Sequence, residues 1–112
     1  MKIHEATRWI LDRGVRTGPY GLDRINFLLE ELDSPQNNCA CVLIGGTNGK
    51  GSVTAITESI MLQCQDYMTG SFTSPHLVDI RERIKIQGRP MPDKLWTKGT
   101  EAIQEVGKIM EK

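Results

Sequence analysis

A glycine-rich segment between an apolar run and an amphipathic pattern constrains this chain more than any other feature. The apolar run covers residues 40–44, and the glycine-rich segment covers residues 45–52. A short apolar run that ends in glycine is typical of a strand buried on both faces in a parallel sheet. Apolar residues then recur at helical spacing over residues 53–64, and residues 67–72 form a weaker strand candidate. The order strand, glycine loop, helix, strand predicts a βαβ unit.

The glycine-rich segment has the chemistry of a phosphate-binding loop. Its glycines allow successive N–H groups to converge, and the following helix adds the positive end of its dipole. Lys50 can reach the outer phosphates of a nucleotide, and the Ser52 hydroxyl could face a metal ion. The match to the common pattern G-x-x-x-x-G-K-[ST] is imperfect, because Ile44 occupies the first glycine position and Gly51 separates Lys50 from Ser52. A tight glycine turn with a solvated lysine is the alternative interpretation.

Two amphipathic helices are expected before the apolar run. Apolar residues recur at helical spacing over residues 3–10, and a glycine- and proline-rich stretch follows over residues 14–21. The second helix covers residues 22–32 and ends before Pro35, because the residue before a proline avoids helical torsions. Residues 36–38 form a polar loop.

A hairpin and a last helix are expected near the end of the chain. Residues 83–87 alternate with period two, residues 88–89 are a predicted turn, and a short return begins at residue 90. Pro92 opens the last helix, since proline is tolerated in a first helical turn. The residues expected on its apolar face are Leu95, Ile103, Val106 and Met110. Trp9 and Trp96 are interpreted as packing residues.

Composition narrows the class of protein. The 112 residues carry 14 basic and 14 acidic side chains, so the net charge of zero argues against a general nucleic-acid binder. No apolar run reaches the length that spans a bilayer, and no secretory signal is recognisable, so we expect a cytoplasmic protein without a membrane partner.

Cys39, Cys41 and Cys64 are interpreted as reduced thiols. Cys39 and Cys41 would face one side of a strand, where core packing or a metal pair are the alternatives.

Several motifs together resemble one enzyme family. Residues 46–52, Gly-Thr-Asn-Gly-Lys-Gly-Ser, look like the nucleotide loop of folylpolyglutamate synthases and bifunctional dihydrofolate synthases, which belong with the Mur ligases. Residues 72–77, Phe-Thr-Ser-Pro-His-Leu, followed by residues 81–84, are similar to the folate-side Ω loop of that family. Residues 20–25 resemble its N-terminal element, and residues 88–91 resemble its hairpin turn. The likeness covers nearly the whole chain.

The resemblance implies an α/β fold, with a P-loop βαβ start of a Mur-ligase-like central ATPase domain and an incomplete parallel sheet with N-terminal helices. It identifies residues 1–112 as the N-terminal part of the ATP-binding domain, without the C-terminal glutamate-ligase domain. The acidic metal ligand, histidine and modified lysine of the family's later segment match no position here. We therefore expect that the isolated chain binds ATP weakly and does not turn over.

The resemblance also implies a reaction. ATP phosphorylates a carboxylate on the pterin substrate, and the amine of glutamate then displaces phosphate from the acyl phosphate. Lys50 and Mg²⁺ would neutralise the charge on the transferred phosphoryl group. The residues implied for ATP are Thr47, Asn48, Gly49, Lys50, Gly51 and Ser52. Those implied for Mg²⁺ are Ser52 and Ser74, and those implied for the folate substrate are Pro75, His76 and Arg83.

The sequence allows other roles for two of these residues and other classes of function. Ser74 could be a turn or cap serine before Pro75, and Glu82 could lie on a solvated loop edge. The same motifs fit dihydrofolate synthase activity on dihydropteroate. A P-loop kinase or NTPase is a different class, although it has no reason to carry residues 73–75. A non-catalytic nucleotide-binding module is the third possibility, and the sequence does not determine an oligomeric state.

Overall fold

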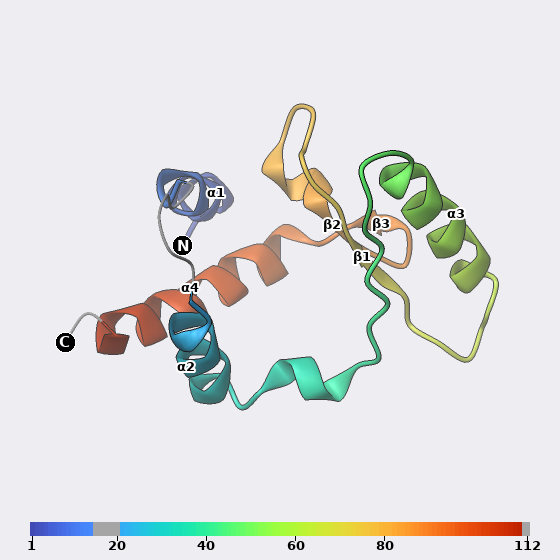
Figure 1. Ribbon diagram of the computed structural model, residues 1–112. Coiled ribbons are helices and arrows are strands. Elements are labelled where there is room, and N and C mark those ends of the chain that lie inside the picture. The colour runs from blue at the N-terminus through green and yellow to red at the C-terminus, as the bar shows by residue number, and fades with distance from the viewer. Residues whose placement is uncertain (15–20, 111–112) are drawn as a thin grey trace. The chain divides into compact units, whose positions relative to one another are not determined.

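The computed structural model describes residues 1–14 and 21–110 (Figure 1). Tyr20, the first residue of the N-terminal family motif, lies outside the described residues, as does most of the predicted glycine- and proline-rich stretch. The chain divides into two compact units. Unit 1 comprises Met1–Cys41 and Asp93–Lys112, and unit 2 is Val42–Pro92. None of the helices in the described ranges has the length and apolar character needed to cross a membrane.

Unit 1 is helical. It contains α1 (Ile3–Asp12), α2 (Asp23–Glu31), the short 3-10 helix η1 (Pro35–Asn38) and α4 (Asp93–Met110), and both α1 and α2 contact α4. The small core consists of the side chains Ala6, Trp96, Thr100 and Val106, so Trp96 is a packing residue as predicted. The first two helices occur where their periodicity predicts them. Residues 36–38 were expected to be a loop and instead form most of η1, because Pro35 already has the torsion that opens a helical turn.

The buried face of α4 agrees with the predicted one at Val106 and differs at other positions. Leu95 is 44% exposed and Ile103 is 38% exposed, whereas Thr100 is buried beside Trp96. The Thr100 hydroxyl donates to the carbonyl oxygen of Trp96 at 2.7 Å, which removes the cost of burying a polar group. A prediction based on apolar side chains alone therefore missed the threonine and placed the face slightly off its true position.

Unit 2 contains one helix and a three-stranded sheet. Helix α3 (Lys50–Leu62) precedes β1 (Gly70–Phe72), and the 3-10 helix η2 (Ile80–Arg83) precedes β2 (Ile84–Ile86) and β3 (Arg89–Pro90). The strand order is β1-β2-β3, and both pairs are antiparallel, with Ser71 opposite Lys85 and Ile86 opposite Arg89. Helix α3 contacts β1 (Figure 1).

The parallel sheet expected from residues 40–44 is not present in the described part of the chain. These residues are not in a strand, and the sheet that forms is antiparallel. A strand needs a hydrogen-bonded neighbour, and the apolar run has none within the described ranges. Val42 is 81% exposed and Leu43 is 98% exposed. The predicted apolar face of α3 is also open to solvent, since its members Val53, Ile56 and Ile60 are all exposed.

The turn between β2 and β3 packs closely against the last residue of α3. Gln87 and Gly88 have φ values of 54° and 78°, which is the type I′ conformation of a two-residue hairpin. The predicted turn at residues 88–89 was therefore one residue late. A Cβ atom at Gly88 would lie 3.1 Å from Cδ1 of Leu62, the last residue of α3. The absence of a side chain at Gly88 lets the helix end pack against the hairpin.

Two glycine-to-alanine substitutions should have opposite effects on local stability. Gly88→Ala forces an alanine into the left-handed region and against Leu62, so it should destabilise the hairpin by about 1–2 kcal/mol. Gly99→Ala places a better helix former in α4, where no atom lies within 4 Å of the new Cβ, and should stabilise that helix by about 1 kcal/mol. Native-state hydrogen exchange of the hairpin and α4 amides measures both effects. Equal changes in amide protection in the two variants would contradict the left-handed conformation and close packing of Gly88.

Candidate functional site

The glycine loop enters α3 through two positive-φ glycines. Gly46 has φ 140° and Gly49, the residue before the helix, has φ 77° and ψ 0°. An L-residue rarely adopts such torsions, so these two glycines are required by the path of the backbone. Together they turn the chain from the unpaired apolar run into the first turn of the helix.

The first turn of α3 offers backbone donors. The N–H of Val53 donates to the Gly49 carbonyl at 2.9 Å, which closes the first helical hydrogen bond. The N–H groups of Lys50, Gly51 and Ser52 precede it and have no helical acceptor. The positive end of the helix dipole lies at the same place, so the arrangement suits an anion such as a phosphate group.

Gly51 has no structural reason to be glycine within the described chain. Its φ is not positive, and a Cβ atom built on it meets no atom within 4 Å. A glycine in a helix costs roughly 1 kcal/mol relative to alanine. Nothing in the packing offsets that cost. Gly99 and Gly107 in α4 have the same open surroundings, so Gly51 is distinguished by its place in the first turn after the glycine loop.

The side chains at this helix end are available to a ligand. Lys50 is exposed, and no ion pair of the described residues involves it. Ser52 is exposed as well, and its hydroxyl makes no hydrogen bond within the described chain. Thr54 differs from it, because its hydroxyl donates to the Lys50 carbonyl at 2.7 Å. Ser52 is therefore the free hydroxyl of this turn.

The predicted second metal residue, Ser74, lies in the loop between β1 and η2. It is exposed, as is Pro75, and its hydroxyl also has no hydrogen bond within the described chain. No group of three or more His, Cys, Asp or Glu side chains that could hold a metal occurs in the described ranges. A hydroxyl oxygen is a ligand that a hard cation such as Mg²⁺ accepts beside waters and phosphate oxygens. No hydrogen bond joins Ser52 to Ser74 within the described residues.

Both ends of the loop 73–83 are held together. The Thr73 N–H donates to the Arg83 carbonyl at 2.9 Å, just beyond the pairing of Phe72 with Ile84. Ile80, at the start of η2, is buried. The tip is open, since Leu77 is 93% exposed and Val78 is 90% exposed. An apolar tip that is anchored at its base is a surface that a ligand or another segment can reach.

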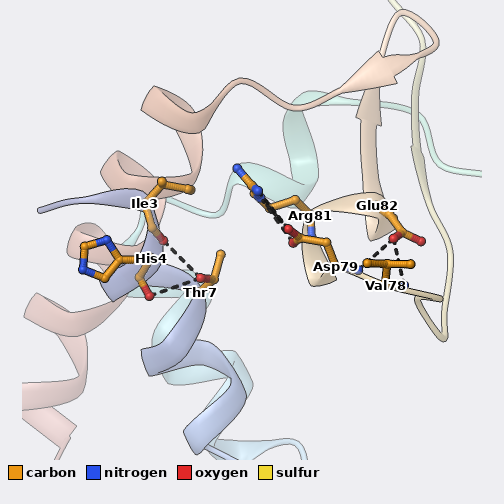
Figure 2. Close-up of polar contacts among 7 residues, drawn as sticks. All are labelled: Ile3, His4, Thr7, Val78, Asp79, Arg81 and Glu82. Carbon is orange, nitrogen blue, oxygen red and sulfur yellow. Dashed lines mark hydrogen bonds and ion pairs between the residues drawn. The ribbon is translucent and has the colours of Figure 1, made fainter.

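Glu82 binds three consecutive backbone amides of this loop. Its carboxylate accepts from the N–H groups of Leu77 at 3.0 Å, Val78 at 2.9 Å and Asp79 at 2.7 Å. Figure 2 shows the Glu82 side chain turned toward the backbone at Val78 and Asp79. These hydrogen bonds, that from Leu77 first, lower the pKa of Glu82 from its ordinary value of 4.5. The carboxylate replaces the backbone acceptors that the loop lacks.

Asp79 and Arg81 complete the start of η2. The Asp79 carboxylate accepts from the Arg81 N–H at 2.9 Å and pairs with the Arg81 guanidinium at 2.8 Å (Figure 2). Side-chain hydrogen bonding to Arg81 lowers the pKa of Asp79 to about 2. The Asp79 side chain also accepts from the Glu82 backbone, and the Asp79 N–H donates to the Glu82 carboxylate, so Asp79 and Glu82 form a capping box.

His76 and Arg83, both predicted to contact the substrate, lie against each other. The Arg83 Nε–H donates to Nδ1 of His76 at 2.9 Å. Because the guanidinium stays protonated, Nδ1 must be the acceptor, and a neutral ring then carries its proton on Nε2. No carboxylate of the described residues forms an ion pair with Arg83. The pair presents an unneutralised cation and an Nε2–H donor.

The role of Glu82 was not predicted from the sequence. Glu82 was interpreted only as part of a segment similar to the family's Ω loop, or as a residue on a solvated loop edge. The signal was nevertheless present, because Asp79 and Glu82 have the D-x-x-E spacing of a capping box. That spacing would have assigned the two carboxylates to backbone amides.

The cysteine prediction was partly wrong. Cys39, Cys41 and Cys64 are free thiols, but all three are exposed rather than packed in a core. Cys39 and Cys41 do face one side, with their Sγ atoms 3.7 Å apart, and the interaction with Cys41 raises the pKa of Cys39. Burial failed to occur because the apolar run beside them has no partner strand in the described residues.

Comparison with curated proteins supports the resemblance. The chain is 40% identical over 96 residues to the dihydrofolate synthase/folylpolyglutamate synthase of Bacillus subtilis, covering 83% of this chain and 21% of that protein. It is 49% identical over 72 residues to the dihydrofolate synthetase of Saccharomyces cerevisiae, covering 64% and 17%. No family model matches the sequence.

Solved structures agree with the sequence matches. The folylpolyglutamate synthase of Thermotoga maritima has a TM-score of 0.81 and 33% identity, covering 97% of this chain and 26% of that one. The Mycobacterium tuberculosis synthase complexed with ADP and AMPPCP has a TM-score of 0.78 and 30% identity, covering 93% and 23%. A complex of FPGS with AMPPCP and folate has a TM-score of 0.77 and 26% identity, covering 99% and 27%.

The chain matches an N-terminal portion of the folylpolyglutamate synthase and dihydrofolate synthase family. It spans about a fifth of the length of the curated relatives described above, which are covered to 17% and 21%. The α/β, Mur-ligase-like fold class implied by the motifs is confirmed at the level of these structural neighbours. The site residues within that fold stay predictions.

The two carboxyl groups of the loop should titrate abnormally. Carbon-13 NMR should give a midpoint of about 2 for Asp79 and a midpoint below 4.5 for Glu82. Because both pKa values are lowered in the folded state, their contribution to loop stability is present above the ordinary values and is lost as the pH falls through the lowered ones. Arg81→Gln should raise the Asp79 midpoint and leave Glu82 low, since backbone amides hold Glu82. Ordinary midpoints for both groups would contradict the loop structure.

Proposed function

We propose that the glycine loop and the start of α3 bind the phosphates of ATP, in a ligase that adds glutamate to a folate through an acyl phosphate. One observation carries the proposal: the N–H groups of Lys50, Gly51 and Ser52 lie at the start of α3 without helical or side-chain acceptors, beside the exposed side chain of Lys50. Similar structures described as complexes with ADP, AMPPCP and folate support the ligand class.

The chain's own groups would hold and orient the nucleotide. The N–H groups from Lys50 to Ser52 would bind phosphate oxygens, and the lysine would neutralise the charge that develops on the transferred phosphoryl group. Thr47, Asn48 and Gly49 would line the approach to the helix. Ser52 and Ser74 would hold Mg²⁺, which when bound supplies charge neutralisation at the phosphates.

His76 and Arg83 would bind the carboxylate of the folate substrate. Asp79 pairs with Arg81 at 2.8 Å, whereas Arg83 pairs with no carboxylate of the described residues. Arg83 therefore keeps its charge for an external anion, and a guanidinium can bind a carboxylate through two hydrogen bonds. The exposed Pro75 would contact the same substrate.

A second candidate is dihydrofolate synthase activity, in which dihydropteroate is the carboxylate substrate. The yeast relative, 49% identical to this chain, is named a dihydrofolate synthetase, and the Bacillus relative carries both names. Either reaction uses the same phosphate and carboxylate sites. Glutamate as the second substrate and the cytoplasmic location stay predictions.

Lys50→Ala should weaken Mg-ATP binding at least about tenfold, because it removes a charge-assisted contact to phosphate worth roughly 1.5–3 kcal/mol. Lys98→Ala, which removes an exposed lysine of α4, should leave binding unchanged. Isothermal titration calorimetry of the 112-residue chain measures both constants. Equal affinities for the wild-type and Lys50→Ala proteins would show that the loop is not the phosphate site.

Arg83→Ala should weaken folate binding about tenfold, since it removes one charge-assisted carboxylate contact. Arg89→Ala is the matched control, because Arg89 is an exposed arginine in β3 of the same unit. Fluorescence titration with folate measures the two affinities. A loss of affinity in the control equal to that of Arg83→Ala would indicate general electrostatics rather than a carboxylate site.

A further inference from the structure

We infer that Glu82 is a positioning residue that clamps residues 77–79 and thereby presents His76, held against Arg83, as an Nε2–H donor. The inference rests on the proposed function only for the identity of the ligand. The clamp itself follows from hydrogen bonds within the loop.

The clamp is a closed ring of contacts between two short segments. Glu82 accepts from the three N–H groups that directly follow His76, at 2.7 to 3.0 Å. The next residue, Arg83, donates from its side chain to His76 at 2.9 Å. Its carbonyl also accepts from Thr73 at 2.9 Å. Glu82 and Arg83 thus hold the loop through three sets of contacts: to the amides of residues 77–79, to the His76 ring and to the Thr73 N–H.

The ring determines what His76 can offer. The bond from the Leu77 N–H to Glu82 Oε1 fixes the peptide that follows His76. The bond from Arg83 then fixes the orientation of the imidazole and leaves Nδ1 as an acceptor. The remaining ring nitrogen carries the proton. A donor that is oriented before binding loses less conformational freedom when it meets a carboxylate.

A carboxylate is specifically suited to this role. Each of its oxygens accepts without donating, and three amides share the two oxygens. A glutamine at this position could supply only one accepting oxygen, and its NH₂ group would face an amide N–H. An aspartate would keep the charge but is one methylene shorter and could not reach all three amides. Glu82→Gln therefore removes the charge and keeps the length of the side chain, whereas Glu82→Asp keeps the charge and shortens the side chain.

The test compares Glu82→Gln and Glu82→Asp with wild type, using Glu105→Gln as the control. Glu105 lies in α4 and, among the described residues, forms an exposed ion pair with Lys108. Nitrogen-15 NMR of His76 reports the ring tautomer, and amide exchange reports residues 77–79. Titrations with folate and with Mg-ATP report the two ligands.

We expect both Glu82 variants to lose the single Nε2–H signature of His76 and the protection of the three amides. Folate binding should weaken about tenfold in both, while Mg-ATP binding and the control stay as in wild type. A loop that is merely looser would give a mixture of His76 tautomers without a consistent change in folate affinity. Unchanged Mg-ATP binding shows that the unit is still folded.

Two results would overturn the inference. The first is an unchanged His76 signature with protected amides in both variants. The second is a wild-type response of Glu82→Asp, which would make the charge rather than the clamp responsible. If the wild-type chain itself fails to bind folate, the proposed substrate is wrong, and the NMR comparison still decides the positioning role. Should Glu82→Gln lose its hairpin amide signals, Glu82→Asp provides the decisive comparison.

Discussion

Backbone N–H groups need acceptors, and the two loops of unit 2 meet this need in opposite ways. At the start of α3 the N–H groups of Lys50, Gly51 and Ser52 have no helical acceptor, and the side chains around them do not replace it. In the loop 73–83 the carboxylate of Glu82 accepts from three amides in succession. A loop satisfied from within keeps one shape without a ligand, whereas an unsatisfied helix start leaves donors for water or for an anion.

The charges of unit 2 follow from that difference. Asp79 pairs with Arg81, and Glu82 accepts from backbone amides, so both carboxylates of the loop have partners other than Arg83. Arg83 contributes its Nε–H to a neutral imidazole, which leaves its positive charge uncompensated by any described carboxylate. Lys50 is likewise unpaired in the described residues. Lys50 in the glycine loop and Arg83 in the loop 73–83 thus both lack a carboxylate partner among the described residues.

Local signals predicted the helices, the glycine loop and the hairpin, because caps, periodicity and turn glycines act within a few residues. Prediction failed where the outcome depends on a distant partner. Residues 40–44 have a strand pattern but no neighbouring strand in the described chain, and the cysteines beside them are exposed for the same reason. A different failure is local: in α4, Thr100 is buried with its hydroxyl bonded to the carbonyl of Trp96 four residues earlier, which a pattern of apolar residues does not record. The residues of the glycine loop were predicted from their pattern and from a resemblance, and they stay predictions. The D-x-x-E spacing indicates the bond from Asp79 to Glu82, whereas the further bonds from Leu77 and Val78 follow no such spacing rule.

The unpaired apolar run has a consequence for the behaviour of the protein at high concentration. Val42 and Leu43 are almost fully exposed, and no strand of the described residues covers the backbone beside them. Such a segment is a template on which a strand of another molecule can add, so self-association would proceed by intermolecular β-pairing. Its sign would be a gain of sheet signal in circular dichroism as the protein is concentrated. A charged side chain at position 43 would then act as a gatekeeper against aggregation.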